Sequence, residues 1–297
     1  MSAAAGLADD AVAAVSARRL SRLRNVNLLG LVATVATVLA AIVCAFPLYW
    51  GLITTFKPED EIVRPGVQLW PEHFTFQNYW HVLTTTKIGV WYVNSLVTSA
   101  GVTVIVLAMA AGAGYAISQL DFPGRRIFWG LILASFMVPI PALIVTHFEL
   151  MSQFHWINTW AGVIAPQLIA PITVIIYKQF FDSVPKDFRE AAAIDGATEF
   201  QLLFRIYLPM NWGITTALAI ITFIGAWNLF LWPFVAVTTD DQMNITVGIT
   251  QVHDAFGVSY GRDLAVAMLA ALPVAIVYLV FQRKVTQAIM LSAGIKG

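Results

Sequence analysis

Charged and polar side chains able to do chemistry gather in one stretch, residues 190–209, which reads EAAAIDGATEFQLLFRIYLP. The carboxylates and the arginine of this stretch can form charge-assisted hydrogen bonds with a partner of opposite charge. Most of the remaining chain is strongly apolar, so the stretch interrupts it with a surface suited to water. The chemistry that it favours is docking to a soluble partner and not catalysis.

Local signals in this region predict two short helices joined by a tight turn. Pro185 suits a first helical position because its missing N–H is not needed there, and good helix formers follow it. Gly196 can stop this first helix because a glycine adopts a positive φ without steric cost. Thr198 followed by Gln201 forms a capping box, which predicts a second helix that runs towards Pro209.

Other kinds of chemistry find little support. His147 and Glu149 could suggest a metal site or a proton relay, but no third ligand is evident, so we predict no metal site. Cys44 is the only cysteine, which excludes an internal disulfide and a thiolate cluster. No phosphate loop of the G-x-x-x-x-G-K-S/T type is present, so we predict neither ATP hydrolysis by this chain nor a cofactor. A formal net charge of zero, without a basic cluster, gives no indication of nucleic acid binding.

Composition indicates a membrane protein. The 297 residues are 59% hydrophobic and only 11% charged, and the mean hydropathy is +0.75, outside the usual range of soluble domains. Spanning a bilayer takes about 20 mostly apolar residues, and six charge-free intervals are long enough. They are residues 25–56, 88–120, 127–148, 150–177, 206–239 and 264–282. The sequence therefore predicts an all-α membrane protein with six transmembrane helices.

The distribution of lysine and arginine predicts the orientation of these helices, because cytosolic loops carry an excess of both. With a cytosolic N-terminus, thirteen of the 17 basic residues fall on the cytosolic side. They are Arg18, Arg19, Arg22, Arg24, Arg125, Arg126, Lys178, Lys186, Arg189, Arg205, Arg283, Lys284 and Lys296. The outer side holds Lys57, Arg64, Lys87 and Arg262. We therefore expect both termini and residues 190–209 in the cytosol.

Polar residues at lipid depth are candidates for a translocation path, although plain hydrogen bonding between helices is at least as common a use. The candidates are Asn94, Gln167 and Asn228, together with Trp227 beside the last of them. Prolines at positions 139, 141, 166 and 171 interrupt the third and fourth spans. Each removes a backbone hydrogen bond, which suits either helices that line a wet path or kinks that improve packing.

The charged stretch resembles the EAA loop of the permease subunits of bacterial ABC importers. The motif residues are Glu190, Ala191, Ala192, Asp195, Gly196, Ala197 and Pro209. A bare E-A-A triplet would fit any amphipathic surface hairpin, whereas the full spacing is much more specific. Four further segments look like signatures of the carbohydrate-importer branch: residues 55–58 (TFKP), 74–79 (FTFQNY), 92–96 (YVNSL) and 122–125 (FPGR). This chain departs from the branch at Gln119, where an arginine is usual, and at Leu229, where an acidic residue is common.

The resemblance implies the maltose G-type subunit of a carbohydrate importer in the bacterial inner membrane. It implies a cytosolic tail over residues 1–24, a six-helix permease domain over 25–284 with a coupling loop at 183–210, and a second cytosolic tail over 285–297. The implied partners are a second homologous permease subunit, two ATPase subunits and an extracytoplasmic substrate-binding protein, besides membrane lipid. The cargo stays open between a di- or oligosaccharide, an amino sugar, a polyol and a glycerophosphate ester.

The mechanism that the resemblance implies is alternating access: ATP closes the ATPase dimer, the docked loop moves, and the helices change the side to which the cavity opens. A proton-coupled secondary transporter is the alternative. It would be expected to hold ionisable residues at mid-membrane, where the six spans show none except His147 near an end. A membrane-embedded enzyme would need a catalytic pair or a metal cluster, and the sequence shows neither.

Overall fold

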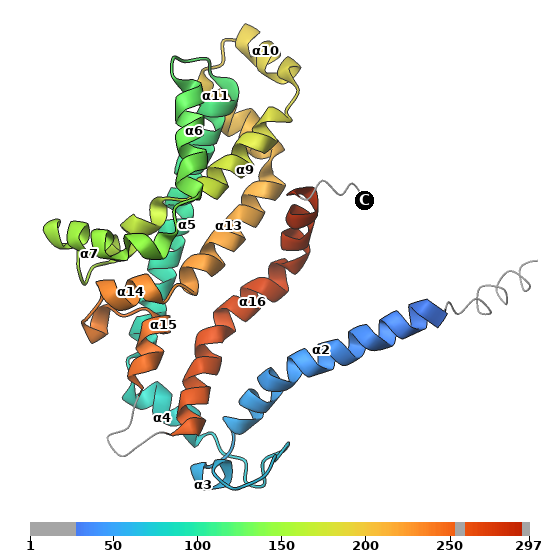
Figure 1. Cartoon of the computed structure of the whole chain (residues 1–297), viewed down its shortest axis with the longest axis vertical. Coiled ribbons are helices and arrows are strands. Elements are labelled where there is room, and N and C mark those ends of the chain that lie inside the picture. Colours follow the sequence, from blue (N-terminus) through green and yellow to red (C-terminus); the bar gives the residue numbers. More distant parts are fainter. Residues whose placement is uncertain (1–27, 253–258, 293–297) are drawn as a thin grey trace, which may run out of the picture. The chain divides into compact units, whose positions relative to one another are not determined.

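Figure 1 shows the structure of the chain, a computed structural model that describes residues 28–252 and 259–292. All regular elements in these residues are helices, and no strand occurs among them, so the predicted all-α fold is confirmed. The chain divides into two compact units: Met1–Thr54 with Pro65–Pro71, and Thr55–Arg64 with Glu72–Gly297. The predicted tail of residues 1–24 lies outside the described residues. Of the predicted tail 285–297, residues 293–297 also lie outside them, and the rest belongs to the last helix.

The smaller unit contains α2 (Leu28–Thr54), which holds Pro47 in its interior. Its residues 30–54 have the length and apolar composition of a membrane span, and every side chain from position 30 to 50 is exposed. Tyr49 fixes the second segment of this unit, because its hydroxyl donates to the carbonyl O of Leu69 at 2.8 Å. A helix that is apolar on all sides needs lipid or another protein around it.

The larger unit carries the remaining helices, with α10 and α11 at one end and α3 and α4 at the other (Figure 1). The α-helices are α3 (Glu59–Ile62), α4 (Gln77–Thr85), α5 (Ile88–Gln119), α6 (Arg125–Phe136), α7 (Ile144–Gln153), α8 (Trp160–Ile164), α9 (Pro171–Asp182), α10 (Lys186–Ile194), α11 (Glu199–Leu202), α12 (Leu208–Met210), α13 (Trp212–Trp227), α14 (Leu231–Ala236), α15 (Ile245–Gly248) and α16 (Tyr260–Ser292). Between them lie the 3-10 helices η1 (Ile140–Leu143), η2 (Ala165–Leu168), η4 (Asp240–Gln242) and η5 (Ile249–Gln251), and the π-helix η3 (Leu203–Tyr207).

Three described helices, α2, α5 and α16, are long and apolar enough to cross a membrane alone. Three further pairs reach that length only together, and each pair is bent: by 94° between α6 and η1–α7, by 52° between α8–η2 and α9, and by 84° between residues 199–210 and α13. By length and composition the described residues therefore offer three to six crossings, and the predicted six is the upper value. The first two bends lie at the predicted prolines, since Pro139 lies in one break, Pro141 follows it in η1, and Pro171 begins α9.

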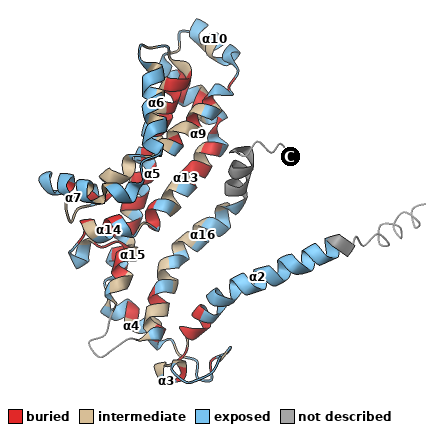
Figure 2. Cartoon of the chain, in the orientation of Figure 1, coloured by how far each residue is buried: buried red, intermediate tan, exposed pale blue. Residues whose placement is uncertain are grey.

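Helix α5 is central to the larger unit, because it packs against α8, α9, α13 and α15 along its length. Buried residues are concentrated on α5, α9 and α13 (Figure 2). Gly114 allows α9 to approach closely, since a Cβ at this position would lie 2.8 Å from Cβ of Tyr177. One core cluster surrounds Tyr177 and Tyr207 near the α10 end, and another contains Trp91 and Trp227 nearer to α4. A rigid central helix thus runs between the two ends of this unit.

Candidate coupling site

The turn of the coupling loop, residues 183–210, is closed by its own backbone. The first helix, α10, ends two residues before Gly196, which has the predicted positive φ, at 75°. The amide of Gly196 donates to Ala193 O at 3.1 Å, and the amide of Ala197 donates to Ala192 O at 3.0 Å. These two bonds form a Schellman motif, which satisfies carbonyls that a helix end leaves without partners. The position of Gly196 directly after the helix end is therefore explained by backbone geometry.

The second helix begins as predicted and then changes its winding. The Thr198 amide donates to Gln201 Oε1 at 2.9 Å, and the Gln201 amide donates to Thr198 Oγ1 at 3.3 Å, so the predicted capping box is confirmed. The predicted second helix does run to Pro209, but its winding changes after Leu202, where the π-helix η3 follows. Pro209 gives the physical reason: it offers no N–H to the carbonyl four residues back, which favours a local change of winding. Pro185 also differs slightly, since it precedes the first position of α10.

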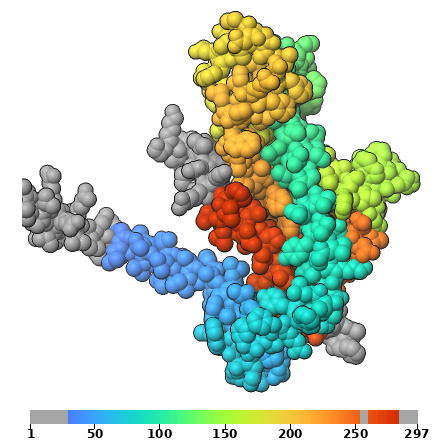
Figure 3. Space-filling view, turned by 180° about the vertical axis from the view of Figure 1, so that it is seen from behind, coloured from blue at the N-terminus to red at the C-terminus, as the bar shows by residue number. Residues whose placement is uncertain are grey.

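The coupling loop exposes large apolar side chains and carboxylates. Its large exposed side chains are Phe188, Ile194, Phe200 and Phe204. Ile194 is 87% exposed and Phe200 is 75% exposed, and Phe200 stacks on Phe204 with ring centroids 5.7 Å apart. Glu190 is exposed on α10, and Asp195 is exposed at the end of that helix. We call these six residues the docking face, which belongs to the projecting yellow and orange end of the molecule in Figure 3. Exposed apolar patches of this kind mark interaction sites.

The remaining motif residues attach the loop to the core. Ala192 and Ala197 are half-buried and pack against the core cluster around Tyr207. Ala191 is exposed, and so is Pro209, which follows the π-helix. The structure thus brings the seven predicted motif residues together in one hairpin, with carboxylates outward and two small side chains inward.

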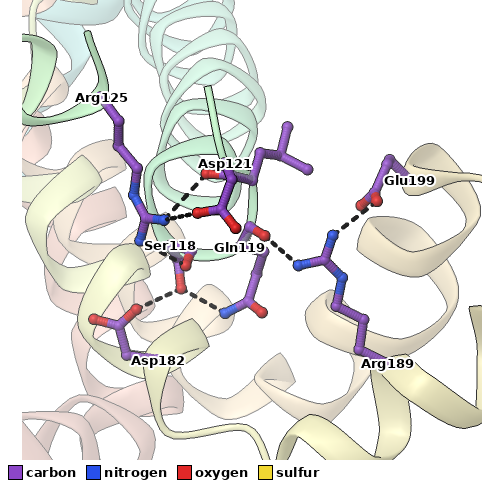
Figure 4. A network of polar contacts seen from close by, with 8 residues as sticks. Ser118, Gln119, Asp121, Arg125, Asp182, Arg189 and Glu199 are labelled. Carbon is purple, nitrogen blue, oxygen red and sulfur yellow. Dashed lines mark hydrogen bonds and ion pairs between the residues drawn. The ribbon is translucent and has the colours of Figure 1, made fainter. Parts of the chain in front are cut away.

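Arg189 connects this hairpin to the end of α5. The last carbonyls of any α-helix lack partners within the helix, and a cation near them also interacts favourably with the helix dipole. Arg189 Nη1 donates to the carbonyl O of Gln119, the last residue of α5, and Arg189 Nη2 lies 2.9 Å from Glu199 Oε1 (Figure 4). One side chain of the coupling loop therefore caps the central helix.

Two tyrosines complete the connection. The Tyr115 hydroxyl, on α5, donates to Glu199 Oε2, and the Tyr207 hydroxyl, on η3, donates to Gln119 Oε1 at 2.7 Å. The sequence marks Gln119 only as a departure from the branch and gives no indication of a role for Tyr115. The chain separation of 84 residues between Tyr115 and Glu199 explains why no local pattern reveals this contact. In the sequence, Arg189 and Glu199 can be recognised only as charged residues next to the motif.

A second group of contacts surrounds the same helix end. Gln119 Nε2 donates to Ser118 Oγ at 2.6 Å and to Phe181 O at 3.2 Å, and Ser118 Oγ donates to Asp182 Oδ1 at 2.6 Å (Figure 4). Arg125, at the start of α6, donates to the carbonyl O atoms of Ser118 and Leu120. The end of α5 is thus bonded to α6, α9 and the coupling loop together.

The predicted translocation residues do not form one group. Asn94 is buried and fully engaged: its amide donates to the carbonyl O atoms of Asp241 and Met243 at 2.9 and 3.0 Å, and its carbonyl accepts from Trp160 Nε1 at 2.9 Å. Trp227 is also buried, and its Nε1 donates to Ala270 O at 3.3 Å. These two residues hold helices together. Asn228 is exposed at the end of α13.

Gln167 alone among these candidates lines a mostly apolar cavity of about 380 Å³. The cavity lies where the bent helices meet, and its lining includes Pro141, Pro166, Val102 of α5 and Gly225 of α13. His147 also lines it, and its ring packs edge-on against Trp232 with centroids 5.8 Å apart. Such a hollow is able to hold part of a solute.

Comparison with known proteins identifies the family. Residues 104–289 match the family described as "Binding-protein-dependent transport system inner membrane component". The chain is 32% identical over 260 residues to the arabinooligosaccharides transport system permease protein AraQ of Halalkalibacterium halodurans, with 86% of this chain and 93% of that protein covered. It is 33% identical over 258 residues to the diacetylchitobiose uptake system permease protein NgcG of Streptomyces coelicolor, with 84% of each covered.

A solved structure supports the fold. It is described as a bacterial ABC transporter involved in the import of the acidic polysaccharide alginate, and one of its chains aligns with a TM-score of 0.77 and 22% identity over 86% of this chain and 96% of that one. The likeness shows a shared fold. Together with the family match over most of the chain, it means that this protein belongs to the binding-protein-dependent transport system inner membrane components, the multi-pass permease subunits of ABC importers.

Proposed function

We propose that this permease subunit imports a carbohydrate or a related solute and that its coupling loop docks onto a separate ATPase subunit. The observation that carries the proposal is that the loop with the docking face is bonded to α5. The bonds are made by Arg189 and Glu199 of the loop and by Tyr115 of α5. A surface that projects from one end of the unit, yet is joined to its central helix, is suited to receive movement from another protein and transmit it.

The docking face would provide both affinity and orientation. Burial of large apolar side chains such as Phe188 and Ile194 contributes about 1.5 to 3 kcal/mol for each fully covered group. The Glu190 carboxylate, exposed on the same helix, would accept a charge-assisted hydrogen bond from a basic group of the ATPase. The ATP chemistry itself takes place in the partner, because the family supplies the transport component and not a catalytic subunit.

Movement of the docked loop would reach the translocation path through α5. That helix packs against α9 and α13, and its Val102 lines the same cavity as Gln167 and Gly225. A tilt of α5 therefore changes the shape of the cavity. Repeated closing and opening of the ATPase dimer would move the cavity between its two orientations, as alternating access requires.

The four predicted path residues take two roles in this proposal. Gln167 offers a polar group to the solute in the cavity, and Asn228 marks the exposed edge of the path at the end of α13. Asn94 and Trp227 position the helices around the path by their hydrogen bonds to η4, α8 and α16.

The assembly that we propose contains a second homologous permease subunit, two ATPase subunits and an extracytoplasmic binding protein. The family description names dependence on a binding protein, and the exposed apolar side chains of α2 and α6 need lipid or a partner permease around them. The excess of basic residues near the coupling loop and the termini supports a cytosolic position for these parts in a bacterial inner membrane. The binding protein would then meet the outer end, around α3 and α4.

A carbohydrate cargo is supported by the two relatives, whose names give an arabinooligosaccharide and diacetylchitobiose as their cargo. Both are oligomeric sugars, and this chain matches most of the length of each relative. Binding proteins and partner permeases contribute to selectivity in such systems, so the exact sugar is set by the whole assembly.

Reconstitution tests the proposal. The chain should be co-purified with its partner subunits, inserted into vesicles and supplied with the binding protein and radiolabelled oligosaccharides. We expect uptake only when ATP is present on the side of the membrane that carries the ATPase subunits. We also expect loaded binding protein to stimulate ATP hydrolysis. Uptake by this subunit alone, or uptake driven by a proton gradient without ATP, would overturn the proposal in favour of a secondary transporter.

A further inference from the structure

A pocket of about 760 Å³ lies beside the turn that joins α5 to α6. Its charged and aromatic lining consists of Asp121, Arg125, Arg126, Trp129 and Lys178, which come from that turn, from the first turns of α6 and from α9. We call it the basic pocket. None of the docking-face residues lines it, so it is a separate surface feature at the same end of the spans.

The charges of the basic pocket do not balance. Lys178 Nζ lies 2.5 Å from Asp182 Oδ2, and Arg125 Nη1 lies 3.0 Å from Asp121 Oδ1, so two cations have carboxylate partners. Arg126 is exposed and forms no ion pair with any residue of the described ranges. The group therefore holds one positive charge in excess. A phosphodiester, which carries one negative charge, would neutralise it.

Hydrogen-bond donors are also left over. A guanidinium has five N–H groups, and Arg125 uses three of them, for Ser118 O, Leu120 O and Asp121 Oδ1. Within the part of the chain that the structure describes, its other two N–H groups have no acceptor. The three bonds fix the guanidinium, which is part of the pocket lining, so its free donors are held in a defined position. Phosphate oxygens are well-matched acceptors for such donors.

The surroundings of the pocket are apolar and exposed. Lys178 Nζ lies 5.0 Å from the centroid of the Trp129 ring, and tryptophan favours the headgroup level of a bilayer. Along the same helix, Ile127, Phe128 and Leu131 are exposed, with Ile127 at 69%, and no residue of α6 is buried. A ligand of this surface therefore has a charged head and apolar chains.

We infer that the basic pocket binds the phosphodiester headgroup of an anionic phospholipid, with the acyl chains along α6. Basic pockets between transmembrane helices on the cytosolic side hold anionic lipid heads in this way. The excess charge at Arg126 selects an anionic lipid over a zwitterionic one, and the spare donors of Arg125 orient its phosphate. The site lies next to the bonded end of α5, so lipid bound there contacts the α6 and α9 helices that surround the coupling network.

Lipid retention by the assembled importer tests this inference. The complex is placed in nanodiscs of phosphatidylglycerol and phosphatidylcholine in equal amounts, recovered in mild detergent, and its retained lipids are quantified by mass spectrometry. We expect enrichment of phosphatidylglycerol in the wild type and a reduction of the retained amount by about fivefold in Arg126→Gln, since one basic residue near the surface contributes about that factor. The exposed, unpaired position of Arg126 means that this variant folds normally.

Lys186→Gln is the matched control, because Lys186 is an exposed cation on α10 outside the pocket, and this variant should retain phosphatidylglycerol like the wild type. A photoactivatable phosphatidylglycerol should also cross-link to peptides from residues 117–131. Equal retention by Arg126→Gln and the wild type overturns the inference. So does displacement of the lipid by inorganic phosphate at equal concentration, which would indicate a site for soluble anions, or a cross-link from Arg126 to the partner permease in place of lipid.

Discussion

Arg189 on α10 and Glu199 on α11 form an ion pair, with Nη2 and Oε1 2.9 Å apart, that bridges the two helices of the coupling loop. The same arginine donates to the last carbonyl of α5, and the same glutamate accepts from Tyr115 of α5. The pair is partly exposed, at 30% and 49%, so its contribution to stability is below about 1 kcal/mol. Its importance lies in the connection of the loop to the central helix.

Arg189→Ala should uncouple transport from ATP hydrolysis without loss of the folded complex. The loop would lose its bond to Gln119 O, so its movement would no longer reach α5. We expect uptake to fall by about tenfold or more, equivalent to about 1.4 kcal/mol of coupling free energy. Uptake and binding-protein-stimulated ATPase activity are measured in vesicles. Lys186→Ala, a cation change on the same helix, is the control, and equal uptake by both variants would contradict the role of Arg189.

Glu190→Ala should weaken docking to the ATPase. A charge-assisted hydrogen bond contributes about 1.5 to 3 kcal/mol, so the dissociation constant should rise by about tenfold or more. Glu190 is exposed, so the variant should reach normal membrane levels. Binding of purified ATPase subunits to the permease pair in nanodiscs measures the effect. Glu190→Gln keeps an acceptor without its charge and should fall between the wild type and alanine; no loss in either variant would remove Glu190 from the docking face.

Gly196 should tolerate asparagine and reject valine. Its φ of 75° is accessible to asparagine, but a β-branched residue is strongly disfavoured there. Beyond its own chain neighbours, a Cβ at Gly196 would meet no atom within 4 Å, so any difference between the variants comes from the local backbone conformation and not from tertiary packing. Stimulated ATPase activity and uptake should be kept in Gly196→Asn and lost in Gly196→Val. Equal activity of both variants would show that the turn does not control coupling.

Acid should loosen the segment around Glu61, which lies in α3. Burial opposes ionisation of this carboxylate, but the amides of Glu72 and His73 donate to it at 2.9 and 3.1 Å. With the charge of Lys57, they hold the pKa of Glu61 below its usual value of 4.5. Ionised Glu61 therefore contributes stability above that usual pKa, and the contribution is lost as the pH falls through the lower value in the folded protein.

Hydrogen exchange of the Glu72 and His73 amides, followed as the pH is lowered through 4.5, checks this expectation after correction for intrinsic rates. Their protection should drop in the wild type as Glu61 is protonated. Glu61→Gln, which removes the titrating group, should show weaker protection without a further acid step. An identical acid step in both proteins would assign it to another group.

The orientation in the membrane can be read by labelling. In a Cys44→Ala background, a single cysteine at Ser183 should react with a membrane-impermeant reagent from the cytosolic side, and one at Gln242 from the outer side. Ser183 is exposed and Gln242 half-buried, so both positions admit a reagent. Labelling in the opposite sense would reverse the topology and remove the coupling loop from the cytosol.

Local rules predicted the parts of the site that local chemistry controls. The positive φ of Gly196, the capping box of Thr198 with Gln201 and the helix breaks at Pro139 and Pro171 each depend on residues close in the chain. Apolar intervals likewise predicted where spans lie, because the length needed to cross a bilayer is fixed. The π-helix was missed, because the effect of a proline on winding depends on how the following helix is held.

Contacts between distant segments could not be predicted in the same way. Tyr115 lies on an apolar face of α5, and nothing near it in the chain indicates Glu199 as its partner. Asn94 looked like a candidate for the path, yet its partners are backbone carbonyls at positions 241 and 243, in a segment that folds back onto α5. The partners of Gln119 are likewise distant in the chain: its side-chain amide accepts from the Tyr207 hydroxyl and donates to Phe181 O.

The Schellman motif and the capping box have a thermodynamic consequence for docking. The Schellman motif satisfies carbonyls at the end of α10, and the capping box satisfies amides at the start of α11. Neither helix end needs a partner protein for these hydrogen bonds. The docking face is therefore preorganised, and association does not have to fix the conformation of a flexible loop, which would cost about 1 to 2 kcal/mol for each residue ordered. In the function that we propose, binding energy at this surface would then be available for the movement of α5.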